Sequence, residues 1–218
     1  MKLLQFNRKI NSEAIRERYD IIRIIAKACE YVVDNQYIEV LNINEIAPET
    51  KAFIFIDKMT RLFIVEDKQI FSVAFPFNVN LIESKVTFRH FEINHSVLAA
   101  INSIVHESME LYNIESLIDC IWENTKEMEL TTEEKQIVDQ IIYHLMSYEM
   151  GYIRYDVDPI NAQKYNERGK LNIHPENHFD INYTSSATYK VGLKSAITMQ
   201  DFVDFLNINT DCWFVKSL

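Results

Sequence analysis

The densest group of reactive side chains in this sequence lies between positions 173 and 183. It holds two histidines, His174 and His178, separated by a turn that contains a proline. From His178 onward polar and apolar residues alternate, which predicts a β-strand with His178, Asp180 and Asn182 on one face. An imidazole, a carboxylate and an amide would therefore line one side of this strand.

Two neighbouring segments carry polar residues with the same alternation. Arg154 and Asp156 alternate with apolar residues before the histidine stretch, and Lys190 and Lys194 do so after it. If the three segments pair as β-strands, their polar side chains meet on one face of the sheet. The predicted patch then contains two histidines, two aspartates and three basic residues.

Such a patch suits two kinds of chemistry, and an ordinary structural role is the third interpretation. A divalent metal would be held by His174, His178 and Asp180, because imidazole and carboxylate are ligands for zinc, manganese and iron. Alternatively, His178 oriented by Asp180 or Asp156 would act as a general base while basic residues bind a phosphate. In the third interpretation the face is the solvated side of an antiparallel sheet, and His178 is a hydrogen-bonded surface histidine.

These alternatives leave open whether the protein is an enzyme, and they assign no cofactor beyond that divalent metal. The catalytic candidates are His174, His178, Asp180 and Asp156, and the candidates for ligand binding are Arg154, Lys190, Lys194 and Asn182.

The elements that must position these residues follow from hydrophobic periodicity and capping signals. Apolar residues at helical spacing predict helices over 12–34, 95–123 and 131–150, and Thr198 begins a last one. Thr131 and Glu134 form a capping box at the start of the third helix. Strands are predicted at 52–57, 62–66, 69–75, 85–93, 152–158, 178–183 and 189–193, with a polar loop over 159–170.

This pattern predicts an α+β fold, in which helices pack on an antiparallel sheet. We expect one domain over residues 1–218, with three sub-parts: 1–94 (helix plus strands), 95–150 (helical) and 151–218 (strands plus a closing helix).

Composition excludes several classes of protein. The chain has three glycines among 218 residues, against about 15 at average usage. Glycine-rich loops for dinucleotides or triphosphates are therefore excluded. Its three cysteines are far apart, so we expect no disulfide and no structural zinc site. The sequence shows no signal peptide and no membrane span, which predicts a cytoplasmic protein that does not bind membranes.

Charge is unevenly distributed. The formal net charge is −10, which argues against indiscriminate coating of nucleic acid. Residues 107–149 contain eleven Asp or Glu and two Lys, a net charge of −9. We expect these acidic helices to be a solvated surface or, alternatively, a docking surface for a protein partner.

Four motifs follow one another in the last third of the chain. They are Tyr-Asp-Val-Asp-Pro at 155–159, His-Pro-Glu-Asn-His-Phe-Asp at 174–180, Tyr-Lys-Val-Gly-Leu at 189–193 and Thr-Met-Gln-Asp-Phe-Val-Asp-Phe-Leu at 198–206. The series resembles bacterial proteins classed as domain of unknown function 2290. The resemblance implies a small cytoplasmic protein, linked in some cases to mobile elements or phage defence, and it implies no particular reaction. Asp180 stands where that pattern has a second histidine, and Lys190 stands where it has an arginine.

We therefore expect a cytoplasmic bacterial protein that acts on a phosphate-containing or nucleic-acid ligand, as a phage-defence or toxin-type effector. The alternative is a non-enzymatic interaction subunit or oligomeric module, whose acidic helices or apolar edges form an interface with a partner or with other copies of the chain. Clustering of the candidate side chains in a cleft favours the first function, whereas their scatter beside a large apolar patch favours the second.

Overall fold

The computed structural model describes residues 2–10, 15, 18–83, 85–108, 114–170, 173–181 and 188–213. Contacts within the chain divide it into two compact units. The first unit comprises Met1–Arg8, Ile38–Ala74 and Gly151–Leu218, and the second comprises Lys9–Tyr37 and Phe75–Met150.

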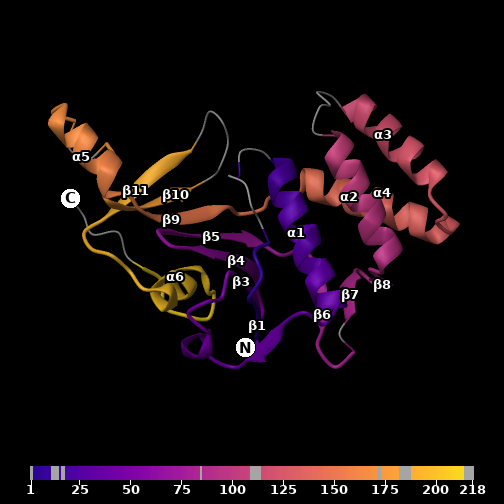
Figure 1. Cartoon of the computed structure of the whole chain (residues 1–218), viewed down its shortest axis with the longest axis horizontal. Coiled ribbons are helices and arrows are strands. Elements are labelled where there is room, and N and C mark those ends of the chain that lie inside the picture. The colour runs from indigo at the N-terminus through magenta and orange to yellow at the C-terminus, as the bar shows by residue number, and fades with distance from the viewer. Residues whose placement is uncertain are drawn as a thin grey trace. The chain divides into compact units, whose positions relative to one another are not determined.

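The first unit is built on an eight-stranded antiparallel sheet (Figure 1). Its strands lie in the order β11-β10-β9-β5-β4-β3-β1-β2. They are β1 (Lys2–Phe6), β2 (Ile38–Val40), β3 (Ala52–Ile56), β4 (Thr60–Glu66), β5 (Gln69–Ala74), β9 (Ile153–Val157), β10 (Asn177–Ile181) and β11 (Tyr189–Leu193). Strands β3 and β4 form a hairpin, in which Ile56 pairs with Thr60.

Helix α6 (Met199–Leu206) covers one face of this sheet. Thr198 begins the helix with a capping box to Asp201, as the sequence predicts. The ring of Phe202 packs against those of Phe63 and Phe179, with ring centroids 6.0 and 5.9 Å apart. The apolar residues of β9 and β10 therefore face α6. The alternating polar residues of these strands point to the opposite face of the sheet.

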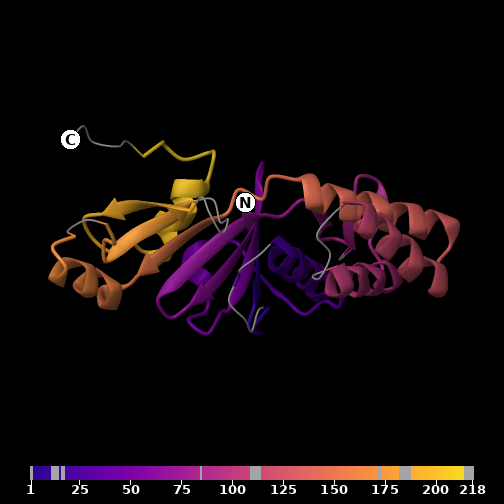
Figure 2. The same ribbon diagram turned by 90° about the horizontal axis from the view of Figure 1, so that it is seen from above.

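Helix α5 (Pro159–Glu167) stands where the sequence analysis expected a polar loop, so that expectation is wrong. The Asp158 side chain accepts a hydrogen bond from the backbone N–H of Asn161, and Pro159 takes the first helical position. Both are start signals for a helix, and they outweigh the absence of an apolar stripe. Helices α5 and α6 lie on opposite sides of strands β9 to β11 (Figures 1 and 2).

The second unit contains four helices and a small sheet. The helices are α1 (Arg18–Val33), α2 (His95–Ser108), α3 (Ile114–Glu127) and α4 (Thr132–Ser147), and the strands are β6 (Asn78–Asn80), β7 (Lys85–Phe88) and β8 (Phe91–Glu92). Helix α2 contacts the other three helices, and α1 also contacts β7. The capping box at Thr131 is confirmed.

The single helix expected over 95–123 is instead two helices, α2 and α3. Val105 and Ile121 are both buried, yet they would lie about 160° apart around one continuous helix. Two helices allow both residues to face a core.

The α+β class, with an antiparallel sheet and packed helices, is confirmed. The expectation of one domain stays a prediction, because compact units occur within domains as well as between them. All three cysteines are free, as expected. In the described residues, no helix has the length and apolar character needed to span a bilayer.

Candidate functional site

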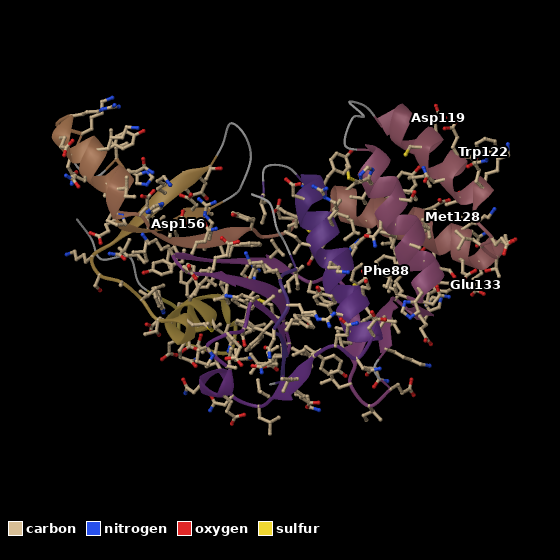
Figure 3. The ribbon with its side chains drawn as sticks, viewed as in Figure 1. Phe88, Asp119, Trp122, Met128, Glu133 and Asp156 are labelled. Atoms are coloured by element: carbon tan, nitrogen blue, oxygen red, sulfur yellow. The ribbon has the colours of Figure 1, made fainter. Side chains whose placement is uncertain are left out.

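Strands β9, β10 and β11 bring the predicted polar residues onto one face of the sheet. In the register, Asp156 lies opposite His178, and Asp180 lies between Arg154 on one side and Lys190 on the other. The strand pairing expected from the sequence alternation is thereby confirmed. Figure 3 marks Asp156 on β9, next to β10. We call Arg154, Asp156, His178, Asp180 and Lys190 the polar cluster.

Two basic residues tie the polar cluster together. Nη2 of Arg154 donates to Oδ2 of Asp156 and to Oδ2 of Asp180, each at 2.7 Å. Nζ of Lys190 donates to Oδ1 of Asp180 at 2.6 Å and lies 2.8 Å from Nε2 of His178. Each carboxylate is thus held by a cation, and the charges of the two aspartates and the two basic residues balance.

The hydrogen bonds of His178 fix the position of its proton. Nδ1 lies 2.7 Å from the carbonyl oxygen of Pro175, which can only accept, so Nδ1 carries the proton. The Lys190 ammonium can only donate, so Nε2 receives that bond with its lone pair. Nε2 also lies 3.5 Å from Oδ2 of Asp156 and 3.6 Å from Oδ1 of Asp180. The lone pair of His178 is therefore directed into the polar cluster.

The histidine and the two carboxylates of the polar cluster are buried, which contradicts the interpretation of His178 as a surface histidine. The exposed fraction of His178 is 0%, and Asp156 and Asp180 are also buried. Burial raises the pKa of Asp156, but the hydrogen bonds and positive charge of Arg154 outweigh this effect and hold the pKa below its ordinary value. Both carboxylates in the cluster therefore have charged partners.

The chain between β9 and β10 covers His178. The ring of His174 meets that of His178 edge-on, with centroids 4.8 Å apart. The ring of Tyr165, from α5, stacks on His174 at 5.7 Å. Nε2 of His174 lies 3.0 Å from Oδ2 of Asp158, at the start of α5. The helix that the sequence analysis missed thus supplies two of the residues that hold His174 over the cluster.

Gly192 allows this cover to approach the sheet. A Cβ atom at Gly192 would lie 2.7 Å from Cγ of Pro175, closer than such atoms approach in proteins. Gly192 is the register partner of His178, and Pro175 supplies the carbonyl group that orients His178. A glycine on β11 therefore sets the orientation of the histidine on β10.

One oxygen in the cluster lacks a partner. Oδ1 of Asp156 is buried and accepts no hydrogen bond in the described part of the chain. A buried acceptor left without a partner costs about 1–3 kcal/mol. Such groups in native proteins call for an explanation, of which a bound ion is one.

Not every predicted site residue is seen in the polar cluster. Lys194 is exposed beyond the end of β11, and within the described residues no hydrogen bond or ion pair links it to the cluster. Asn182 lies outside the described residues. His174 lies above the cluster and bonds to Asp158. The candidates predicted from the sequence did not include Asp158, Tyr165, Pro175 or Gly192, although the Asp-Pro helix start is a signal for Asp158.

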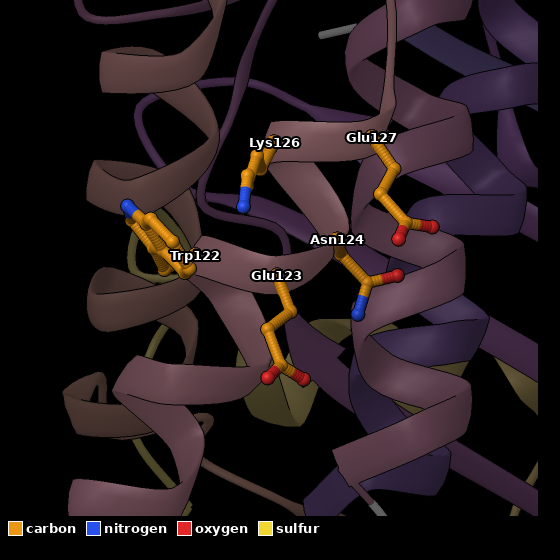
Figure 4. Close-up of a pocket in the computed structure, with 5 residues that line it drawn as sticks. All are labelled: Trp122, Glu123, Asn124, Lys126 and Glu127. Atoms are coloured by element: carbon orange, nitrogen blue, oxygen red, sulfur yellow. The ribbon is translucent and has the colours of Figure 1, made fainter.

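Two surface pockets among the described residues lie elsewhere, in the second unit. One is on α3 and is lined by Trp122, Glu123, Asn124, Lys126 and Glu127 (Figure 4). The other is lined by His90, Phe91, Glu92, Asn94, Thr131, Glu133, Glu134 and Ile137. Neither includes a residue of the polar cluster.

The polar cluster can bind a cation or transfer protons, since it joins an imidazole lone pair to two carboxylates. Comparison with known proteins adds no assignment. The resemblance to domain of unknown function 2290 stays a prediction, since no family model, no curated protein and no solved structure matches this chain.

Proposed function

We propose that the protein acts on a phosphate-containing ligand at the polar cluster, with nucleic acid as the first candidate. The distribution of charge is the main support. The imidazole and the carboxylates of the cluster are buried, whereas the side chains of Arg154 and Lys190 are 24% and 28% exposed. The part of the cluster that solvent reaches is therefore cationic, as recognition of a phosphate requires.

Among the described residues, the partners of Lys190 leave one of its N–H groups for a ligand. An ammonium group has three donors, and Lys190 uses two of them within the cluster. A phosphate oxygen beside Nζ would accept the third. Arg154 is held by two carboxylates, so binding would not have to order its side chain anew, which lowers the entropic cost of binding.

His174 is the group best placed for proton transfer with a bound ligand. Burial raises the pKa of the Asp158 carboxyl, but hydrogen bonds with Asn161 and His174 outweigh this and lower it to about 2. The charged carboxylate holds Nε2 of His174 and leaves Nδ1 for the ligand. His174 would then accept a proton from an attacking hydroxyl, while His178 keeps Lys190 in place.

Hydrolysis assays test this proposal directly. Purified protein is incubated with labelled single-stranded RNA, single-stranded DNA and bis(p-nitrophenyl) phosphate, each with and without Mn²⁺. We expect cleavage of at least one substrate, and a loss of about 100-fold in rate for His174→Gln. Lys190→Gln should raise KM, because it removes a phosphate contact.

Lys58→Gln is the matched control, since Lys58 is an exposed lysine in the β3–β4 turn. This variant should retain full activity. Equal losses in Lys58→Gln and Lys190→Gln, or full activity in His174→Gln, would contradict the proposal.

The role in phage defence or as a toxin is part of the same proposal. Expression in a bacterial host should slow growth or reduce phage plating, and His174→Gln should abolish the effect at equal protein level. An effect that persists in this variant would separate the biological role from the polar cluster.

The second candidate is an interaction subunit, and exposed apolar residues on an acidic helix favour it. On α3, the exposed fractions of Ile118 and Trp122 are 45% and 60%. In this case Trp122→Ala would abolish the cellular effect, whereas His174→Gln would not. The two variants thus distinguish the two functions.

A further inference from the structure

We propose that Asp156, His178 and Asp180 bind one divalent transition-metal ion. When the metal is absent, the ammonium group of Lys190 occupies the place of the metal. The inference concerns the same cluster as the proposed function. Its test measures the metal alone, so either proposal can fail without the other.

The spacing of the three ligand groups fits a metal ion. Nε2 of His178 lies 3.5 Å from an oxygen of Asp156 and 3.6 Å from an oxygen of Asp180. Two ligands at about 2.1 Å from a tetrahedral metal lie about 3.4 Å from one another. Ligand atoms of all three residues lie within 4.8 Å of one another. Only small side-chain movements would close the site.

The ligands are also prepared chemically. The bond from Nδ1 of His178 to the carbonyl of Pro175 fixes the tautomer whose Nε2 can bind a metal, as in many metal sites. Oδ1 of Asp156 is buried without a hydrogen-bond partner among the described residues. The oxygen of Asp156 nearest His178 is Oδ2, so a metal chelated by both oxygens of Asp156 would also satisfy Oδ1. Imidazole together with carboxylates favours zinc, manganese or iron over magnesium.

Lys190 occupies the place of a cation in the cluster. Its ammonium contacts Nε2 of His178 and Oδ1 of Asp180, two of the atoms that would bind the metal. A metal must therefore displace Lys190, whose side chain is partly exposed and can turn outward. After this displacement, all three N–H groups of Lys190 could donate hydrogen bonds to a ligand.

His174 does not belong to this metal site, although it was one of the metal ligands expected from the sequence. Its Nε2 contacts Asp158, and Asp156 takes its place among the ligands. The site then has two carboxylates and one histidine, with open positions for water or for a ligand.

Metal-binding measurements on chelator-treated full-length protein test the inference. Equilibrium dialysis with elemental analysis should find one Zn²⁺ or Mn²⁺ per chain and weaker binding of Mg²⁺. His178→Gln and Asp180→Asn should weaken Zn²⁺ binding more than about 100-fold, beyond the loss of about 10–100-fold that is typical of an outer-shell partner. Co²⁺ should give visible absorption bands that both variants lose.

Two further variants keep the test decisive if the ligand variants fold poorly. Lys190→Met should strengthen Zn²⁺ binding about tenfold, because it removes a competing positive charge a few ångströms from the metal. His174→Gln should leave Zn²⁺ affinity unchanged. The inference fails if the folded wild-type protein binds no Zn²⁺ or Mn²⁺ at millimolar concentration, if Lys190→Met does not bind more tightly, or if His174→Gln loses the metal.

Discussion

Phe179 and His178 are neighbours on β10, and they point to opposite faces of the strand. Both side chains are buried. Phe179 stacks on Phe205 of α6, with ring centroids 4.7 Å apart, whereas His178 is surrounded by a carbonyl group, an ammonium and two carboxylates. The same strand therefore buries one residue in an apolar core and the next in a charged network.

The two kinds of burial tolerate change differently. An apolar core accepts another side chain of similar volume, since dispersion contacts have no fixed direction. In the polar cluster each charged group is paired with a group of opposite charge. Removing one member of a pair leaves an uncompensated charge in an environment of low dielectric constant. The apolar face is thus built for stability, and the polar face fixes the geometry of specific groups at a cost in stability. The predictions below test this difference in order of expected effect.

Phe179→Ala should have the largest effect on stability. Loss of a fully packed phenylalanine costs about 3–5 kcal/mol of unfolding free energy, while Phe179→Leu should cost much less. Urea titration followed by circular dichroism measures both. A loss below 1 kcal/mol for the alanine variant would show that α6 does not depend on this contact.

Asp180→Asn should come next, at about 2 kcal/mol, because it leaves Arg154 and Lys190 without a carboxylate. Breaking a fully buried pair costs more, but both cations are partly exposed and can recover contacts with water. The same titration measures this loss. If Asp180→Asn were as stable as wild type, the ion pairs would contribute nothing to the fold.

Gly192→Ala should cost about 1–3 kcal/mol, the range for inserting an atom into a packed site. Its added Cβ would displace Pro175 and so remove the carbonyl that holds His178. We expect activity to fall more than stability, which is the signature of a positioning role. Pro175→Ala combined with Gly192→Ala should restore part of the activity; failure to do so would refute the steric explanation.

The smallest effect is a pH dependence confined to the polar face. The pKa of Asp158 is lowered to about 2 in the folded protein, below its ordinary value of 3.8. Its contribution to stability is therefore complete above about pH 4 and is lost as the pH falls toward 2. The difference in unfolding free energy between wild type and Asp158→Asn should shrink over that range. The difference for Phe179→Ala should stay constant, and parallel behaviour of the two variants would contradict the comparison.

Sequence alternation predicted the polar face well, because the period of two along β9 and β10 is a local property of the chain. The burial of His178 was not predictable in this way. It depends on the contact of Pro175 with Gly192 and on the stacking of Tyr165 over His174, which the tertiary fold creates. Helix α5 was missed because its evidence lies in the Asp158–Pro159 start and not in an apolar stripe.

Because Lys190 lies on β11, it also affects association between chains. Among the described strands β11 lies at one edge of the eight-stranded sheet, with Tyr189 and Val191 exposed. Unpaired backbone groups on an edge invite a strand from another molecule, and lysine on the edge discourages such pairing. Replacing Lys190 with an apolar residue therefore removes a safeguard against sheet-to-sheet aggregation, so Lys190→Met should become prone to self-association at high protein concentration.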